Sequence, residues 1–254
     1  MEVQILPTKQ AVAEALSEYL VAWCQSREAY HLALSGGSTP KIWFDHMAAH
    51  FREQLPWDAL HWYWGDERCV PPDHPESNYG MTARHLLEPL GIAPDRVHRV
   101  HGEARPDDEA PRYAGVLEAL LPQAHEMPQF DLVILGMGDD GHTASVFPHQ
   151  MGLWDAPEGC VVATHPESGQ KRISLTGPWI NNARRVVFLV TGASKAEMVR
   201  EVLEGPEAAK HYPAARVSPT DGKLLWLLDA EAAAGLSAEF IASCGGIGPV
   251  LPGK

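Results

Sequence analysis

Residues 131–145, DLVILGMGDDGHTAS, join a short apolar run to a glycine-rich loop that is crowded with polar side chains. An apolar run of four or five residues that ends at glycine is typical of a strand buried on both faces, as in a parallel sheet. Further segments of the chain share this strand-like character: 31–35 (HLALS), 60–64 (LHWYW), 160–164, 172–176, 186–190 (VVFLV) and 224–228 (LLWLL). The sequence therefore predicts a sheet of short, buried strands.

Segments with helical spacing of apolar residues separate these strands. The expected helices are residues 8–28, 40–51, 77–88, 107–121 and 194–204. Alternation of short strands with helices predicts an α/β fold, a doubly wound and mostly parallel sheet sandwiched by helices. Because the sequence shows no internal repeat or low-complexity tract, we expect residues 1–254 to form a single domain.

Composition and charge narrow the classes of partner. The chain has 254 residues, 45% of them hydrophobic, and its 20 basic and 33 acidic side chains give 20 − 33 = −13. A negative balance of this size repels nucleic acid and anionic lipid, so we expect neither as a partner. No apolar run approaches the roughly 20 residues of a membrane span, and the first residues lack the pattern of a signal peptide. We therefore expect a cytoplasmic protein.

The four cysteines lie far apart and form no Cys-x-x-Cys pair, so we expect isolated reduced thiols. A thiol of lowered pKa at Cys69, beside Arg68, is the lesser alternative. The chain shows no recognisable set of metal ligands. His46 and His50 lie four residues apart on an expected helix but lack the glutamate of the zinc motif H-E-x-x-H.

In open parallel sheets, ligands bind beyond the carboxyl ends of the strands. The loop after residues 31–34 is Ser35-Gly36-Gly37-Ser38-Thr39-Pro40, and we expect Pro40 to be the first residue of the next helix. Glycine lets a ligand approach the backbone, and the N–H groups at a helix start attract anions, so this loop suits a phosphate. The alternative is a plain tight turn with a Ser or Thr helix cap.

Two other loops supply cations. Asp66-Glu67-Arg68 follows the strand at 60–64, and arginine suits bidentate recognition of phosphate, although such a triplet can also be a solvated charge cluster. Lys195 follows the strand at 186–190 and falls in the first turn of an expected helix. The helix dipole disfavours a cation there unless an anion is near, so its position favours an anion-binding function.

The loop 136–145 contains a pair of side chains suited to acid–base chemistry. His142 lies two residues after Asp140, and a carboxylate can orient an imidazole as a general base. We expect no apolar group to pack against His142 in so glycine-rich a loop. The alternative for Asp140 is that it only caps a following helix.

Two motif matches point to other chemistry, and we give them little weight. Gly136 to Gly141 fits the dinucleotide pattern G-x-G-x-x-G, but its two aspartates would repel a pyrophosphate and Pro148 would end any following helix after about two turns. The segment 192–196, GASKA, approaches the nucleophile elbow of hydrolases, but its last glycine is replaced.

Taken in order, the segments SGGSTP, WGDERCVPPDHPESNYGM, LGMGDDGHTASVFP, RISLTGPWIN, VTGASKAEMV and YPAARVSPTDGKLLWLLD resemble the 6-phosphogluconolactonase family. The resemblance implies a glucosamine-6-phosphate isomerase-like fold and the hydrolysis of 6-phospho-D-glucono-1,5-lactone to 6-phosphogluconate, the second step of the oxidative pentose phosphate pathway. It implies no cofactor. The only partner expected is the sugar-phosphate lactone.

The resemblance also implies roles for individual residues. His142 is expected to activate water, with Asp140 beside it as the second catalytic residue. The other residues of the family motifs are expected to bind substrate: Ser35, Gly36, Gly37, Ser38, Asp66, Arg68, Arg172 and Lys195. Arg68, Lys195 and the SGGS backbone are expected to hold the phosphate.

Two alternatives remain open. The related amino-sugar-phosphate isomerases and deaminases carry D-E-Y and an acidic residue five positions after the histidine, where this chain has Arg68 and Phe147. A sugar-phosphate-binding regulator without catalysis is the other. The intact pair of Asp140 and His142 argues against the regulator.

Overall fold

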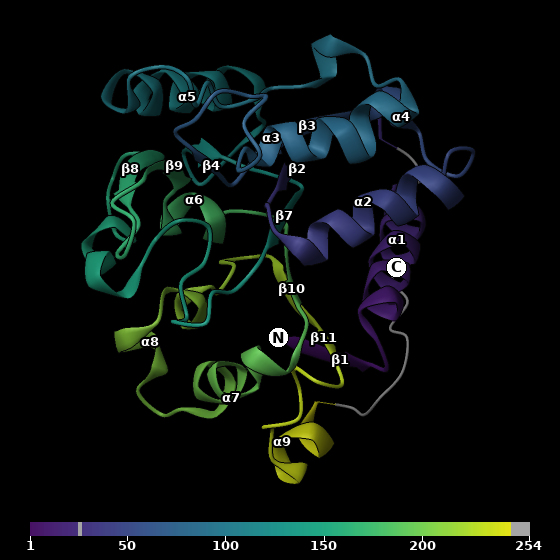
Figure 1. Ribbon diagram of the computed structural model, residues 1–254, viewed down its shortest axis with the longest axis vertical. Coiled ribbons are helices and arrows are strands. Elements are labelled where there is room, and N and C mark those ends of the chain that lie inside the picture. Colours follow the sequence, from purple (N-terminus) through teal and green to yellow (C-terminus); the bar gives the residue numbers. More distant parts are fainter. Residues whose placement is uncertain (25–26, 245–254) are drawn as a thin grey trace.

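A six-stranded parallel sheet forms the centre of the molecule in a computed structural model, which describes residues 1–24 and 27–244. The sheet runs down the middle of Figure 1. Its strands follow the order β1 (Glu2–Leu6), β11 (Lys223–Asp229), β10 (Arg185–Val190), β7 (Leu132–Leu135), β2 (Tyr30–Leu34) and β3 (Leu60–Trp64). Every pair of neighbours is parallel, which confirms the fold class expected from the sequence.

Helices cover both faces of this sheet. On one side α1 (Lys9–Trp23) packs against α2 (Ser38–His50), and on the other lie α7 (Ala196–Glu204) and α8 (Ala208–His211) (Figure 1). All four residues of β7 are fully buried, which explains the unbroken apolar runs in the sequence. The remaining helices are α3 (Asn78–Thr82), α4 (Glu88–Leu90), α5 (Pro106–Leu120), α6 (Gly177–Asn181) and α9 (Ala238–Ser243).

A second, antiparallel sheet was not expected. It consists of β4 (Asp66–Arg68), β9 (Lys171–Leu175) and β8 (Cys160–Thr164), so the predicted loop at 66–68 is a strand, and the strand-like segments near 160 and 172 lie outside the main sheet. A hairpin of β5 (Gln123–Ala124) and β6 (Met127–Pro128) is also present. Because Arg68 pairs with Arg172 in register, the small sheet brings two distant arginines together.

Some element boundaries differ from those expected. The first helix ends at Trp23, short of the expected residue 28, and residues 25–26 of that expected helix lie outside the described chain. Pro40 is the third residue of α2, because Gly37 caps this helix with a φ of 112°, a conformation that glycine adopts readily. A π-helical turn at 83–87 interrupts the helix expected at 77–88.

The strand order reverses direction between β2 and β7. The chain runs outward from β2 to β3 on one side and from β7 through β10 to β11 on the other. A reversal of this kind opens a crevice at the carboxyl ends of the two central strands. The loops that leave β2 and β7 there are the SGGSTP loop and the loop that carries His142.

Imidazole rings stack at the opposite, amino end of the strands. His31 and His61 face each other across β2 and β3, and His98 stacks on both His61 and Tyr63. His61 Nδ1 lies 3.0 Å from His98 Nε2, and Arg96 Nη1 lies 2.7 Å from His61 Nε2. Burial, with the neighbouring His61 and His31, lowers the pKa of His98 to about 4.

This stack predicts a loss of stability in mild acid. As the pH falls from 6.5 to 4, His98 becomes protonated in the unfolded chain but stays neutral in the folded protein. The free energy of unfolding should therefore fall by about 1 to 2 kcal/mol, allowing for solvent screening. Above pH 6.5 His98 is neutral in both the folded and the unfolded state, so it causes no loss of stability there. Urea unfolding across this range measures the slope, and His98→Phe, which keeps a stacked ring without the titration, should flatten it. An unchanged slope in the variant would contradict the assignment.

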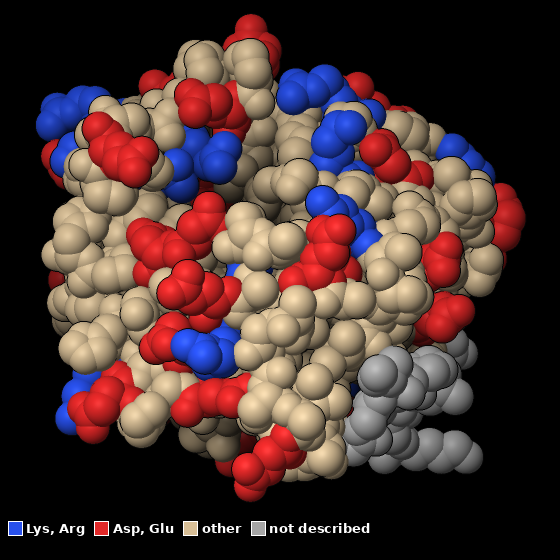
Figure 2. All heavy atoms as spheres, turned by 60° about the horizontal axis from the view of Figure 1, so that its bottom comes forward, with Lys and Arg blue, Asp and Glu red and all other residues tan. Residues whose placement is uncertain are grey.

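The surface carries the acidic balance of the sequence. Asp and Glu side chains are scattered across the face shown in Figure 2, with Lys and Arg side chains among them. In residues 1–24 and 27–244, no helix is long and apolar enough to cross a membrane.

Candidate active site

A cavity of about 210 Å³ lies at the carboxyl ends of the central strands. It gathers residues from the small antiparallel sheet and from loops far apart in sequence, and its lining includes Ser35, Gly36, Asp66, Arg68, Asn78, His142, Arg172 and Lys195. Asp140 stands directly behind His142. Of the substrate-binding residues expected from the sequence, only Gly37 and Ser38 do not line this cavity, and both line an adjoining one.

Asp140 holds the imidazole of His142 by two contacts to one carboxylate oxygen. Asp140 Oδ1 lies 2.6 Å from His142 Nδ1 and accepts the backbone N–H of His142 at 3.1 Å. Burial alone would raise the pKa of Asp140, but the hydrogen bond and charge of His142 outweigh burial and lower it. With an ionised carboxylate on Nδ1–H, the Nε2 atom carries the free lone pair.

One expectation about this loop is wrong, and the alternative role of Asp140 finds no support. His142 does have an apolar neighbour, because its ring packs on the buried ring of Phe147 at 4.5 Å between centroids. Asp140 caps no helix, since residues 139–147 form turns and a bridge rather than a helix. The absence of a helix directly after Gly141 also agrees with our rejection of the dinucleotide motif.

Gly138 makes room for the pair. A methyl group at residue 138 would lie 2.1 Å from His142 Nδ1 and 2.6 Å from Asp140 Oδ1, so it would push both side chains from their positions. Glycine is required here by the close approach of the imidazole, which the sequence pattern alone did not reveal.

Gly138→Ala should therefore lower kcat by about 100-fold although it removes no functional group, because a general base must sit within hydrogen-bond reach of its proton. Steady-state kinetics measures the loss. Gly115→Ala, at a position where a methyl meets no atom within 4 Å, is the control and should retain wild-type turnover. Equal kinetics for both variants would contradict the geometry.

The small sheet presents two guanidinium groups to the cavity. Arg68 Nη1 donates to Glu76 O, and Arg172 Nη1 lies 3.5 Å from Ser145 Oγ. In the described part of the chain, neither Nε atom has a hydrogen-bond partner although both are buried. Burial lowers the pKa of Arg172, and the neighbouring Arg68 acts in the same direction. These donors are suited to an anionic or oxygen-rich ligand.

Lys195 and the start of α2 form the other end of the site. A second cavity of about 140 Å³ lies against Gly36, Gly37, Ser38 and Thr39, and Lys195 lines both cavities. Asp139 already supplies an anion beside Lys195, with its Oδ1 2.7 Å from Nζ, so the position of Lys195 in a helical turn does not by itself indicate an anionic ligand. Backbone N–H groups at a helix start, hydroxyls and one ammonium together make a site suited to phosphate.

Three site residues were missed from the sequence. Ser145 Oγ donates to Asp66 Oδ2 at 2.6 Å and so ties the His142 loop to β4. Asn78 lines the cavity, and the buried Glu67 accepts hydrogen bonds from the backbone beside it. Burial, the largest influence, raises the pKa of Glu67 against those hydrogen bonds. Asn78 lies in the segment SNYGM of the family resemblance. The polar Ser-Asn pair in that segment was the sequence signal that could have identified Asn78 as a site residue.

The lesser alternatives find no support in the geometry. Burial, with Glu67 and Glu109, raises the pKa of Cys69 to about 11, the opposite of an activated thiol. His46 is tied to Gln10, with His46 Nδ1 at 3.0 Å from the amide nitrogen. Within the described ranges, 1–24 and 27–244, no group of three or more His, Cys, Asp or Glu side chains is arranged to hold a metal ion.

Comparisons with known proteins cover most of the chain. A sequence profile of the family described as glucosamine-6-phosphate isomerases/6-phosphogluconolactonase matches residues 7–226. The chain is 49% identical to the 6-phosphogluconolactonase of Treponema pallidum over 201 residues, 78% of this chain and 83% of that protein. It is 43% identical to the 6-phosphogluconolactonase of Haemophilus influenzae over 224 residues, 88% and 94% of the two. The solved structure of the devB protein matches with a TM-score of 0.89 at 41% identity, over 93% of this chain and 99% of that one.

Proposed function

The chain belongs to the family of glucosamine-6-phosphate isomerases and 6-phosphogluconolactonases, and we propose that it hydrolyses 6-phospho-D-glucono-1,5-lactone to 6-phospho-D-gluconate in the oxidative pentose phosphate pathway. One observation carries the proposal. The Asp140–His142 pair faces the same cavity as Arg68, Arg172 and Lys195, so a base and an anion site are within reach of one small substrate.

His142 acts as the general base in this proposal. Its Nε2 takes a proton from water as the water oxygen bonds to the lactone carbonyl carbon, and Asp140 stabilises the resulting imidazolium. When the bond from that carbon to the ring oxygen breaks, the imidazolium returns the proton to the leaving oxygen. A lactone is an activated ester, so one base and hydrogen-bond donors to the oxyanion suffice without a covalent nucleophile.

The phosphate lies where the two cavities meet. Gly36 and Lys195 line both of them, and the start of α2 contributes Gly37 and Ser38 on the far side. Arg68 lines the first cavity from β4, and among residues 1–24 and 27–244 its buried Nε has no hydrogen-bond partner. Held at this end, the phosphate orients the lactone carbonyl toward His142.

An amino-sugar-phosphate isomerase or deaminase is less well supported. The position five residues after His142 holds Phe147, whose ring is fully buried and contacts both the imidazole and the Arg172 guanidinium. No carboxylate can act from that position. A non-catalytic regulator would leave the ordered Asp140–His142 pair without a use.

Loss of freshly made 6-phosphogluconolactone, followed as proton release and corrected for spontaneous hydrolysis, tests the proposal. We expect rapid loss that survives exhaustive chelation. Ammonia release from glucosamine 6-phosphate would favour the deaminase instead, and binding without turnover would favour the regulator. Activity lost on chelation and restored by zinc or magnesium would overturn the metal-free mechanism.

The remaining expectations stay proposals. They are that residues 1–254 act as one domain in the cytoplasm, without a cofactor and without nucleic-acid or membrane partners. The negative net charge supports the last two.

A further inference from the structure

Asn78 presents an unused acceptor to the active-site cavity. Its side chain is 2% exposed, and its Nδ2 donates to the backbone oxygen of Asp66 at 2.9 Å, which fixes the orientation of the amide. The Oδ1 atom therefore faces Gly36, so closely that a methyl group at residue 36 would lie 1.7 Å from it. Among residues 1–24 and 27–244, no hydrogen bond reaches this oxygen.

A buried carboxylate holds Asn78 in this position. Glu67 is 2% exposed, and each of its carboxylate oxygens accepts two hydrogen bonds. Oε1 accepts the N–H groups of Arg68 and Asn78, both at 2.8 Å, and Oε2 accepts Tyr79 N–H at 2.8 Å and Ser77 Oγ–H at 3.1 Å. Glu67 thus ties the start of α3 to the strand that carries Asp66 and Arg68.

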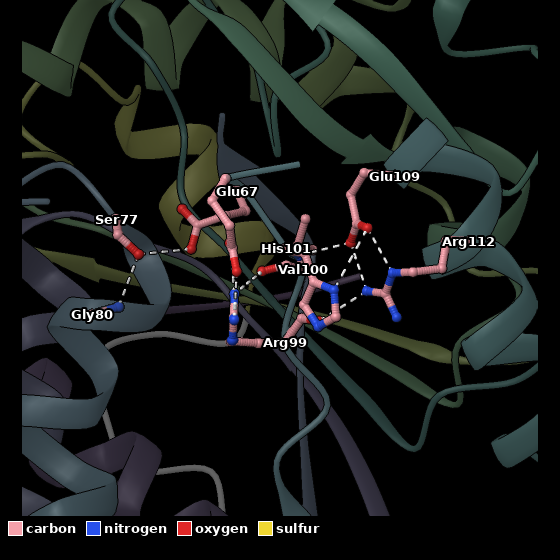
Figure 3. A network of polar contacts seen from close by, with 9 residues as sticks. Glu67, Ser77, Gly80, Arg99, Val100, His101, Glu109 and Arg112 are labelled. Carbon is pink, nitrogen blue, oxygen red and sulfur yellow. Dashed lines mark hydrogen bonds and ion pairs between the residues drawn. The ribbon is translucent and has the colours of Figure 1, made fainter. Parts of the chain in front are cut away.

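The two residues on either side of Asn78, Ser77 and Tyr79, make further contacts that hold them in place. Ser77 caps α3 by accepting the N–H of Gly80, and Figure 3 shows this cap beside Glu67. The guanidinium of Arg99 lies over the ring of Tyr79 at 5.4 Å and is itself paired with Glu103. The helix cap at Ser77 and the contact of Arg99 with Tyr79 therefore hold both neighbours of Asn78, which leaves Asn78 little freedom to turn away from the cavity.

From this arrangement we infer that Asn78 Oδ1 accepts a hydrogen bond from one ring hydroxyl of the sugar lactone, and that Glu67 is the residue that positions it. The inference rests on the proposed function. An amide oxygen in a buried cavity loses its water when a ligand enters, so a hydroxyl in its place restores the hydrogen bond. A substrate without that hydroxyl leaves the oxygen unpaired, and Asn78 thereby selects a polyol lactone.

Deoxy analogues of the substrate provide the test. We would measure kcat/KM for the 6-phospho lactones that lack the 2-, 3- or 4-hydroxyl, with the wild type and with Asn78→Ala. The wild type should lose about 10- to 100-fold on one analogue, as an unpaired buried acceptor implies. Asn78→Ala should lose a similar factor on the parent lactone but treat that analogue within about 3-fold of the parent.

Glu67→Gln tests the positioning role. A glutamine at residue 67 presents its NH₂ to donors that now meet a carboxylate oxygen, so Asn78 should shift and discrimination against the same analogue should fall. Asn181→Ala is the matched control, because the Asn181 amide donates to the backbone oxygen of Arg216 and accepts the backbone N–H of Ser218. It can lower stability, but it should keep the wild-type discrimination.

Equal rates of the wild type on all three analogues and the parent would overturn the inference without any variant. The inference would also be overturned if, for every analogue, the loss caused by Asn78→Ala simply multiplied the loss caused by the missing hydroxyl. Wild-type discrimination retained in Glu67→Gln would remove the positioning role. If the wild type opens none of the lactones, the proposed function is refuted, which is a different result from uniform activity.

Discussion

Glutamine in place of His142 is expected to lower kcat by about 100-fold or more, because the variant keeps a hydrogen-bonding side chain but has no lone pair basic enough to take the proton of water. The side chain approaches Asp140 at 2.6 Å and packs on Phe147, so a glutamine of similar reach should leave the loop in place. Steady-state hydrolysis of the lactone, corrected for its spontaneous opening, measures the effect.

The affinity of this variant for 6-phosphogluconate is the control and should stay within a few-fold of the wild type, since the phosphate end is untouched. Asp140→Asn should give a smaller loss of the same kind, because the amide still contacts the imidazole but cannot stabilise its charged form. Near wild-type turnover of His142→Gln would remove His142 from the mechanism.

Removal of one cationic side chain from the proposed phosphate site should weaken substrate binding and also lower the rate of hydrolysis. Arg68→Ala or Lys195→Ala is expected to raise KM and to lower kcat/KM by about 10- to 1000-fold, the range for losing a charge-assisted contact that also orients the substrate. Both residues line the cavity that holds His142, and Lys195 also borders the start of α2. Kinetics on phosphorylated and unphosphorylated gluconolactone separates the phosphate contribution from general lactonase activity.

The double variant should lose most of its preference for the phosphorylated lactone. Inorganic phosphate should compete with substrate in the wild type and compete poorly in either single variant. Lys41→Ala provides a matched control, because this exposed lysine on α2 pairs with Asp45 and its removal should leave the preference unchanged. If both single variants keep the wild-type preference, the phosphate roles of Arg68 and Lys195 are wrong.

The parallel sheet could be predicted because its strands are buried on both faces and so appear as unbroken apolar runs. The strand β4 could not, since Asp66-Glu67-Arg68 consists wholly of charged residues and no propensity favours a strand there. Its backbone pairs with β9, and its two carboxylates find buried partners outside the strand, Ser77 for Glu67 and Ser145 for Asp66. Tertiary hydrogen bonds therefore override local preference at this strand.

The site was predictable where a loop follows a main-sheet strand, as for Ser35, His142 and Lys195. Asn78 and Ser145 were missed because their roles depend on contacts across the fold: the backbone oxygen of Asp66 for one, its carboxylate for the other. The need for glycine at residue 138 also depends on a contact made in the fold. The chain turns back after Gly138, so the imidazole of His142, four residues later, would collide with a side chain at residue 138.

In the proposed phosphate site, the carboxylate of Asp139 is already paired with Lys195 and would compete with an incoming anion for the ammonium. An incoming anion must displace a tethered carboxylate from the ammonium. A monovalent ion such as chloride exchanges one charge contact for another and gains little. A phosphate dianion brings a second charge and further oxygens for the N–H groups at the start of α2. If Lys195 binds the substrate phosphate as proposed, Asp139 would therefore favour a phosphate dianion over a monovalent anion at this site.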